Sequence, residues 1–313
     1  MPPTSRSLQV LVLGAGATGG WFGARLIEAG ADVAFLVRPA RAAALAADGL
    51  RIHGTSRPFA APVRALTAVP GDARYDLVLL SCKAYDLDAA IEAIRPAVGA
   101  DTRVLPLLNG LRHLDALDAA FGAPRVLGGL CHISATLEPD GTIRQFGALE
   151  RLTWGARRAD DPALPALRAT LRRMPGDVRE PADILGAMWE KFAFIAALAG
   201  VTCLLRAPVG VIAASGEGAV LARRLYAECA AVAAREGHPL DAAACLEAER
   251  ILTAPGSPLK ASMLRDIERG GRTEGEHILG DLRDRARRAG LDTPLLAAAH
   301  AHVAAYERQR AIA

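Results

Sequence analysis

The sequence has few cysteines and no closely spaced pair of them. Its 313 residues include five cysteines at widely separated positions, without a Cys-x-x-Cys motif. An odd, scattered set excludes a disulfide framework and offers no zinc-ligand spacing. The seven histidines give no ligand set either, because His300 and His302 are two residues apart and would lie on different faces of a helix. We therefore expect a reducing compartment, the cytoplasm, and no metal site.

The chain also lacks a strong excess of charge and a long apolar run. Lys and Arg together number 37 against 34 Asp and Glu, a formal net charge of +3, which does not suggest a nucleic-acid partner. A hydrophobic content of 51% excludes a disordered polyelectrolyte. No apolar stretch precedes a cleavage site near the N-terminus, and the longest apolar run, 192–205, is shorter than the ~20 residues that cross a bilayer. We interpret that run as a buried core helix and expect no membrane partner.

Short apolar runs that end near glycine or polar residues dominate the first half of the chain. Runs at 8–13, 32–37, 76–82 and 103–108 are typical of strands buried in a parallel sheet, and helices are predicted at 18–29 and 87–97. Further runs at 126–133, 142–146 and 151–154 are separated by turn residues and predict an antiparallel end to this sheet.

Strand signals vanish in the second half. Helical patterns cover 184–205, 217–236, 241–253 and 274–289, with glycine and proline between them. With roughly 150 residues per domain, the chain is long enough for two domains. The predicted fold is α/β, with an N-terminal Rossmann-type, doubly wound sheet in residues 1–182 and a C-terminal all-helical domain in residues 183–313.

A glycine-rich segment follows the first predicted strand and opens the first helix. In such a segment the first glycine permits the tight turn, the second lets the backbone approach a pyrophosphate, and the third allows close helix packing. Backbone N–H groups and the positive helix end then bind phosphate. A simple connecting turn is the alternative, but the flanking pattern favours a dinucleotide site made of Gly14, Ala15, Gly16, Ala17, Thr18 and Gly19.

The residue at the end of the second predicted strand bears on the choice of cofactor. NAD enzymes place an acid there, about 20 residues after the glycines, to bind the ribose, whereas this chain has Arg38. A guanidinium can hold a 2′-phosphate through charge-assisted hydrogen bonds worth about 1.5–3 kcal/mol, which favours NADPH. The alternative is a solvated surface arginine, and Arg41 has the same two interpretations.

Several motifs occur in the order that one family shows, over nearly the whole chain. In that order the sequence resembles the ketopantoate reductases (2-dehydropantoate 2-reductases). The motifs are the glycine loop, Arg38, Ser81-Cys82-Lys83-Ala84-Tyr85, Leu108-Asn109-Gly110-Leu111, Trp189-Glu190-Lys191, Ser262-Met263-Leu264-Arg265-Asp266 and Thr273-Glu274.

The resemblance implies an active site in the cleft between a Rossmann domain and a helical domain. It implies the metal-free, NADPH-dependent reduction of a 2-oxo acid to a 2-hydroxy acid, as in pantothenate biosynthesis, and it allows a homodimer. It also implies that Lys191 is the general acid and contacts substrate, that Asn109 and Lys83 lie at the nicotinamide end of the cofactor, that Ser262 contacts substrate, and that Glu274 contacts the cofactor ribose or orders the site.

The residue types suit this chemistry without the family. Hydride addition to a ketone creates an alkoxide, which needs a proton donor, and Lys191 heads an apolar helix where desolvation favours proton release. Each residue keeps a structural alternative. Lys191 could pack its stem and expose its ammonium, Asn109-Gly110 could be only a turn, and Lys83 could lie on the surface. Ser262 could cap a helix, and Glu274 could stabilise a helix dipole.

The sequence departs from the family at two positions on the lysine-bearing helix. Where the resemblance calls for substrate-binding asparagines, this chain has Ile195 and Ala199. Each amide that is lost costs the polar substrate roughly 1–3 kcal/mol. Arg206 could supply a carboxylate partner or interact with the helix C-terminus. Ketopantoate reduction therefore has two alternatives, a reductase of a more apolar 2-oxo acid and a non-catalytic NADPH-binding sensor, against which Lys191 argues.

Overall fold

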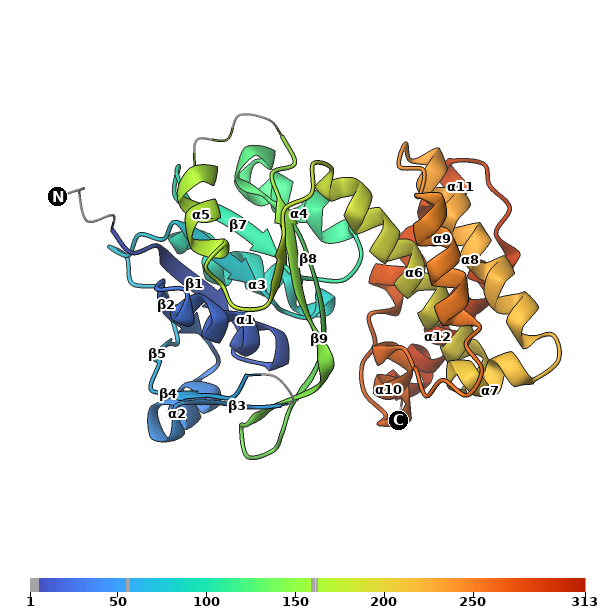
Figure 1. Ribbon diagram of the computed structural model, residues 1–313, viewed down its shortest axis with the longest axis horizontal. Coiled ribbons are helices and arrows are strands. Elements are labelled where there is room, and N and C mark those ends of the chain that lie inside the picture. The colour runs from blue at the N-terminus through green and yellow to red at the C-terminus, as the bar shows by residue number, and fades with distance from the viewer. Residues whose placement is uncertain (1–5, 55–56, 159–160, 162, 313) are drawn as a thin grey trace. The chain divides into compact units, whose positions relative to one another are not determined.

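The structure is a computed structural model that describes residues 6–54, 57–158, 161 and 163–312. It divides the chain into two compact units (Figure 1). The first comprises Met1–Leu108 and His113–Ile184, and the second comprises Asn109–Arg112 and Leu185–Ala313. The short segment Asn109–Arg112, which leaves the first unit and returns to it, thus packs with the second.

A five-stranded parallel sheet forms the centre of the first unit. Its strand order is β5-β2-β1-β6-β7, where the strands are β1 (Gln9–Leu13), β2 (Asp32–Leu36), β5 (Arg64–Leu66), β6 (Leu77–Leu80) and β7 (Arg103–Pro106). The accompanying helices are α1 (Ala17–Glu28), α2 (Pro39–Asp48), α3 (Leu87–Ile94) and α4 (Arg112–Phe121), with 3-10 turns at Ala84–Asp86, Arg95–Ala97 and Ala123–Arg125. The four predicted parallel strands and the two predicted helices are confirmed, whereas the three-residue β5 escaped prediction.

The predicted antiparallel end of this sheet is wrong. The chain forms an isolated bridge to β7, between Val126 and Val104, and then enters a separate sheet. There β8 (Gly128–Leu137) pairs antiparallel with β9 (Ile143–Gly155), which is one long strand where the sequence suggested two. The second sheet has the order β10-β9-β3-β4, where β3 is Leu50–His53, β4 is Phe59–Ala61 and β10 is Asp177–Arg179.

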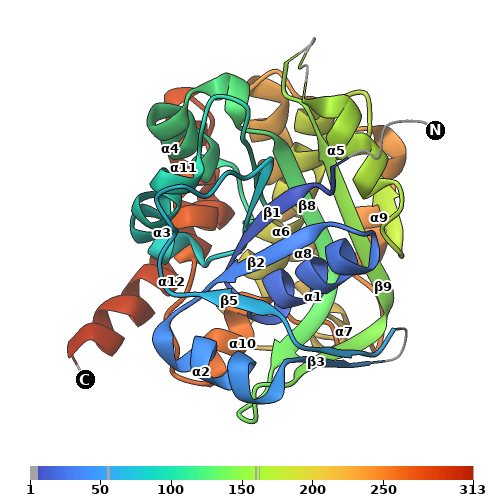
Figure 2. The ribbon, with the colours of Figure 1, turned by 90° about the vertical axis from the view of Figure 1, so that its left-hand side faces the viewer.

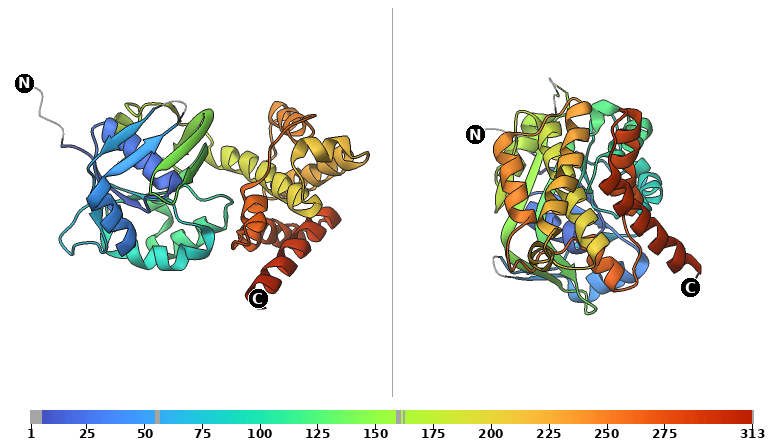
Figure 3. Two further views of the ribbon diagram at one scale, coloured as in Figure 1. Left: turned by 90° about the horizontal axis from the view of Figure 1, so that it is seen from below. Right: turned by 90° about the vertical axis from the view of Figure 1, so that its right-hand side faces the viewer.

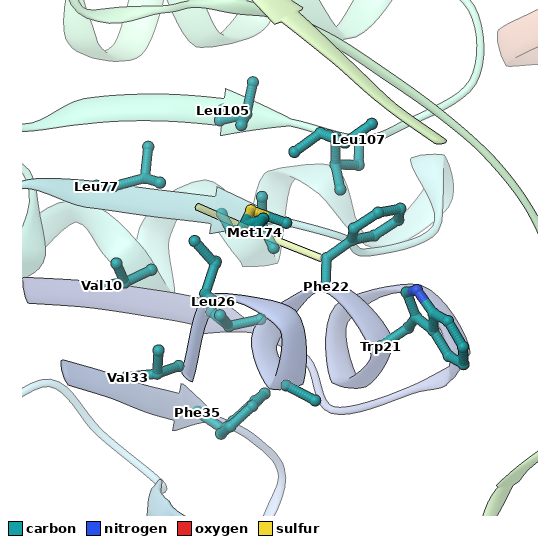
Figure 4. Packing of buried hydrophobic residues seen from close by; sticks show 14 of the residues in the cluster. Val10, Trp21, Phe22, Leu26, Val33, Phe35, Leu77, Leu105, Leu107 and Met174 are labelled. Carbon is teal, nitrogen blue, oxygen red and sulfur yellow. The ribbon is translucent and has the colours of Figure 1, made fainter. Parts of the chain in front are cut away.

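Helix α1 lies between the two sheets, which explains its composition. Figure 2 shows it beside β1, β2 and β5, and Figure 4 shows its Trp21, Phe22 and Leu26 among side chains of the strands. A β-carbon at Gly23 would lie 2.5 Å from the ring of Phe35 in β2, and one at Gly20 would lie 2.3 Å from Cδ1 of Ile143 in β9. The glycines therefore let both sheets approach α1, and they fix where its N-terminus points.

The second unit is helical (Figure 3). Its helices are α6 (Ile184–Leu205), α7 (Val209–Ala214), α8 (Gly218–Arg235), α9 (Ala242–Leu252), α10 (Ser262–Glu268), α11 (Asp281–Arg288) and α12 (Pro294–Ile312), and α5 (Leu164–Leu171) belongs to the first unit. The four predicted helices are present, but the last one begins as a π-helix, Glu276–Gly280. The fold class, a Rossmann-type sheet followed by a helical region, is confirmed.

Helix α6 has the length and composition that could span a membrane. It is the one such helix among the described residues, and 61% of its most apolar window is buried inside the protein. This burial agrees with its interpretation as the core helix of the second unit.

Candidate functional site

Three loops of the first unit follow adjacent parallel strands. The glycine loop follows β1, Arg38 follows β2, and Lys83 follows β6, and β1 lies between β2 and β6 in the sheet. In an open parallel sheet, ligands bind beyond the carboxyl ends of the strands. The structure thus brings the predicted cofactor-binding residues of this unit to one edge of one sheet.

The glycine loop has the geometry of a phosphate cradle. Gly14 has a φ of +91°, a conformation that L side chains rarely adopt, so it makes the turn out of β1. A β-carbon at Gly19 would lie 2.2 Å from the carbonyl oxygen of Gly14, so the third glycine closes the loop against the first. A β-carbon at Gly16, in contrast, would meet no atom of the described residues within 4 Å.

The open position at Gly16 faces the start of α1. Gly16 is the N-cap of that helix, and Ala17 and Thr18 lie in its first turn, which carries no carboxylate. The free N–H groups and the positive end of the helix dipole suit an anion. Ala15 is buried. Ser81 donates to the carbonyl of Leu13 at 2.8 Å and ties the loop to the end of β6. The residues present therefore fit a dinucleotide pyrophosphate.

Arg38 and Lys83 lie on the exposed side of the same edge. Arg38 is the N-cap of α2, and its side chain is 85% exposed. Its guanidinium lies 3.1 Å from a carboxylate oxygen of Asp86, at the end of the 3-10 turn that Lys83 caps. Arg38 is thus an exposed arginine, as the structural alternative required, but it is also positioned by the segment that contains Lys83.

Arg41 is neither a fully exposed residue nor a partner of Asp86. Its Nε donates to the carbonyl of Ala15 at 3.1 Å, and another guanidinium nitrogen donates to the carbonyl of Gly141 at 2.9 Å. Burial lowers its pKa from the ordinary value, and the nearby charge of Arg51 acts in the same direction. Arg41 therefore braces the glycine loop against the turn between β8 and β9, a role that its sequence position did not reveal.

Lys191 lies on α6 of the helical unit and is half-buried, whereas Trp189 and Phe192, whose ring centroids lie 5.6 Å apart, are buried. One and two turns later, Ile195 is half-buried and Ala199 is buried. Residues four apart share a helix face, so apolar side chains continue the face that carries the lysine.

Asn109 and Glu274 occur in one polar cluster of the helical unit, joined by His277. The ring of His277 hydrogen-bonds the backbone of Asn109 and interacts electrostatically with Glu274 and Asp281. Burial lowers the pKa of His277, and the two acids and the Asn109 backbone oppose that shift. Glu274 is only 8% exposed and directly precedes the π-helical segment. The structure therefore brings together two predicted residues through a third, His277, that the sequence analysis did not single out.

Ser262 and Arg206 are both exposed residues of the helical unit. Ser262 is exposed and is the first residue of α10, whose N-cap is Ala261, so the helix-capping alternative does not describe it. Arg206 is exposed and follows α6 with a φ of +53°, in the left-handed conformation common after helix ends.

The scarcity of asparagine and lysine in the sequence is a further signal for Asn109, Lys83 and Lys191. Asn109 is the single asparagine of the chain, and lysine occurs only at 83, 191 and 260, whereas the other basic residues are arginine. Lys260 forms an exposed ion pair with Glu268, so the scarcity of lysine supports Lys83 and Lys191 only together with their motifs. Arginine holds its proton too firmly to serve as an acid.

Metal chemistry receives no support from the side chains. In the part of the chain that the structure describes, no group of three or more His, Cys, Asp or Glu side chains could hold a metal ion.

Comparison with known proteins identifies the family. The model of ketopantoate reductase PanE/ApbA matches residues 10–159, and that of its C-terminal domain matches residues 183–307. An uncharacterized oxidoreductase, YkpB of Bacillus subtilis, is 37% identical over 97% of this chain and 100% of its own. The crystal structure of 2-dehydropantoate 2-reductase from Geobacter metallireducens is 30% identical, with a TM-score of 0.86 over 95% of this chain and 99% of that chain.

A further solved structure shares the fold alone. A D-mandelate dehydrogenase, crystallised with NADH and anilino(oxo)acetate, is 22% identical, with a TM-score of 0.87 over 97% of this chain and 99% of that chain. The family models cover most of both units, so the chain is an oxidoreductase of a family that uses a nicotinamide cofactor. The protein belongs to the ketopantoate reductase PanE/ApbA family.

Proposed function

We propose that the protein reduces a 2-oxo acid to a 2-hydroxy acid with NADPH, as a ketopantoate-type reductase, with Lys191 as the general acid. One observation carries the proposal. In a chain whose positive charge is almost entirely arginine, Lys191 is half-buried on the apolar helix α6. An ammonium in that setting suits proton donation better than surface charge.

The first unit would bind the cofactor. The N–H groups at the start of α1 would hold the pyrophosphate across the open position at Gly16, and Arg38 would hold the 2′-phosphate. When bound, the reduced nicotinamide supplies a hydride. Lys83 and Asn109 would contact the nicotinamide end, as the family resemblance implies.

The contact between Arg38 and Asp86 does not prevent this binding. Both side chains are substantially exposed, and an exposed ion pair contributes only about 0–1 kcal/mol. A phosphate carries nearly two negative charges at neutral pH and can bind a guanidinium through two parallel hydrogen bonds. The 2′-phosphate would therefore displace Asp86 at small cost.

The helical unit would complete the reaction. As hydride reaches the carbonyl carbon, the C=O π electrons move to oxygen, and Lys191 would give one proton to the resulting alkoxide. The lysine leaves this step neutral and regains its proton from solvent. Ser262 would contact the substrate, and Glu274 would order the site or contact the cofactor ribose.

A second candidate, a reductase of a more apolar 2-oxo acid, rests on Ile195 and Ala199. These residues continue the face of α6 that carries Lys191 and offer no hydrogen bond. A polar substrate group left unpaired against them would lose roughly 1–3 kcal/mol. The candidate keeps the same reaction and changes only the side chain of the substrate.

A matched pair of substrates separates the two candidates. 2-Dehydropantoate and 3,3-dimethyl-2-oxobutanoate differ by one hydroxyl, so the ratio of their kcat/KM values in an NADPH oxidation assay reports on that group. A preference for 2-dehydropantoate supports ketopantoate reduction, and a preference for the other acid supports the apolar alternative. The Ile195→Asn variant should move the ratio toward 2-dehydropantoate by roughly 10- to 100-fold. Tight NADPH binding without oxidation by any branched 2-oxo acid would contradict both candidates and indicate a sensor.

A further inference from the structure

The segment Asn109–Arg112 is held by the helical unit although it connects β7 to α4 of the other unit. The segment is attached to the helical unit at His277, whose ring hydrogen-bonds the Asn109 backbone. We call this contact the fastening. This bond favours the charged ring, so the ring N–H donates to the Asn109 carbonyl. The bond joins a loop and a π-helix that are far apart in the sequence.

Gly110 makes the close approach feasible. It has a φ of +81°, and a β-carbon there would lie 3.2 Å from Cδ2 and 3.3 Å from the backbone oxygen of His277. Any side chain at this position would push the loop away from the histidine. The Asn-Gly pair is therefore more than a solvent-exposed turn, because its backbone is fitted against the π-helix.

His277 is the second residue of the π-helix Glu276–Gly280. A π-helical turn is rare and occurs often at functional sites. It runs directly into α11, where Asp281 is buried and interacts electrostatically with His277. His277 therefore lies between the Asn109 backbone and a buried carboxylate.

A buried polar chain supports that carboxylate. Arg285 binds Asp281 at 3.2 Å and Glu236, at the end of α8, at 2.6 Å. The Arg285 guanidinium also lies 5.4 Å from the ring centroid of Trp189, two residues before Lys191. One set of contacts thus reaches from the helix that carries Lys191 to the loop that carries Asn109.

We propose that His277 is a positioning residue that fastens the Asn109–Arg112 segment to the helical unit, so that the Asn109 amide is held in register with Lys191. The inference rests on the proposed function for the role of Asn109 at the nicotinamide. The fastening itself does not depend on that function. Asp281, which is bound by Arg285, acts on the histidine ring through its negative charge.

Hydrogen–deuterium exchange tests the fastening without any need for turnover. His277→Phe keeps an aromatic ring at this position but removes the ring N–H donor. The peptide that contains Asn109–Arg112 should therefore exchange its backbone amide hydrogens at least tenfold faster than in the wild type. His277→Gln keeps an N–H donor and should restore most of the protection. His53→Phe, at an exposed histidine of β3 in the other unit, is the matched control and should leave this peptide unchanged. Unaltered exchange in His277→Phe would overturn the inference.

Kinetics test the consequence. A displacement of about 1 Å of a reacting group costs roughly 100-fold, so His277→Phe should lower kcat by about 10- to 100-fold, with the KM for substrate within threefold and the melting temperature within a few degrees. Faster exchange with unchanged kcat would contradict the positioning role. Should His277→Phe not fold, Gly110→Ala tests the same joint from the loop side and should give the same two effects. If the wild type oxidises no NADPH, the proposed function fails, and the exchange result still decides the fastening.

Discussion

At the scale of single residues, Arg38 shows how one side chain can set cofactor choice. It stands at the end of β2, largely exposed, 3.1 Å from Asp86. An arginine in this place can recognise a 2′-phosphate but has no acceptor for the two ribose hydroxyls. The proposed preference for NADPH therefore depends on this one guanidinium and on the small cost of breaking its ion pair with Asp86.

Replacing Arg38 with aspartate should weaken the binding of NADPH much more than that of NADH. The variant loses about 1.5–3 kcal/mol of charge-assisted hydrogen bonding to the phosphate, so NADPH affinity should fall roughly 10- to 100-fold while NADH affinity changes much less. Fluorescence titration with both cofactors measures this. Arg74→Asp, at an exposed arginine before β6, controls for the charge change. Equal losses for NADPH and NADH would remove Arg38 from the 2′-phosphate site.

The residue types at the candidate site were predictable, whereas some of their contacts were not. Asn109, Lys191 and Glu274 follow from motif order and chemical type. His277 was not singled out, because the Asn109 backbone with which it interacts is distant in sequence and carries no side-chain signal. Arg41 was ambiguous for the same reason, since it binds backbone carbonyls of Ala15 and Gly141. A side-chain contact to a backbone group cannot be predicted from residue types, because every residue has the same backbone groups.

At the scale of elements, the start of α1 combines two glycines with opposite requirements. A β-carbon at Gly19 would collide with the Gly14 carbonyl at 2.2 Å, whereas the space around Gly16 is open among the described residues. Gly19 is needed by the folded chain itself. Gly16 is needed only if a ligand fills the open space beside its α-carbon.

Two alanine substitutions distinguish these requirements. Gly16→Ala should leave the free energy of unfolding within about 0.5 kcal/mol and weaken NADPH binding at least tenfold, because the methyl group occupies the pyrophosphate position. Gly19→Ala should cost about 1–3 kcal/mol of stability through overpacking. Urea unfolding and cofactor titration measure both, with Gly71→Ala as a control in open space. Unchanged NADPH affinity in Gly16→Ala would contradict the proposed cradle.

The π-helix gives the helical unit a pH dependence of definite sign. Burial lowers the pKa of His277, Arg112 lowers it further, and Glu274, Asp281 and the Asn109 backbone oppose the shift. The unfolded chain therefore takes up a proton at this residue near pH 6.5, before the folded chain does. Stability should fall as the pH drops below about 6.5, by at most about 1.4 kcal/mol per pH unit for this one group.

Urea unfolding of wild type and His277→Gln at pH 7.5 and pH 5.5 tests this expectation. The other titrating groups are common to both proteins, so the difference isolates His277. The wild type should lose more stability than the variant on acidification. An equal loss in both proteins would show that the His277 ring does not titrate differently in the folded and unfolded states.

The long, strongly patterned elements were predictable, and the short ones were not. Helix α6 and the four buried strands have apolar runs that tertiary structure does not override. Strands β3, β4 and β5 have three or four residues each and lie among polar residues. The separate second sheet was missed because the departure of the chain from β7 after Val126 depends on packing around α1, which local sequence does not encode.

At the scale of the whole molecule, the chain distributes the proposed reaction over two compact units. The glycine loop, Arg38 and Lys83 belong to one unit, and Lys191, Ser262, Glu274 and Asn109 belong to the other. In the proposed function the first unit binds the pyrophosphate and the 2′-phosphate, and the second supplies the proton donor together with Asn109 and Glu274. Substitutions in the glycine loop or at Arg38 should therefore affect cofactor affinity, and substitution of Lys191 should affect turnover.

The general acid is the claim on which this account chiefly depends, and one variant tests it. Lys191→Ala, compared with Lys260→Ala at the exposed ion pair with Glu268, should be assayed for NADPH affinity and for single-turnover NADPH oxidation with the best 2-oxo acid. The account predicts a rate lower by roughly 10²- to 10⁴-fold in Lys191→Ala, with NADPH affinity within twofold of the wild type and Lys260→Ala unaffected. Turnover by Lys191→Ala at the wild-type rate would contradict it.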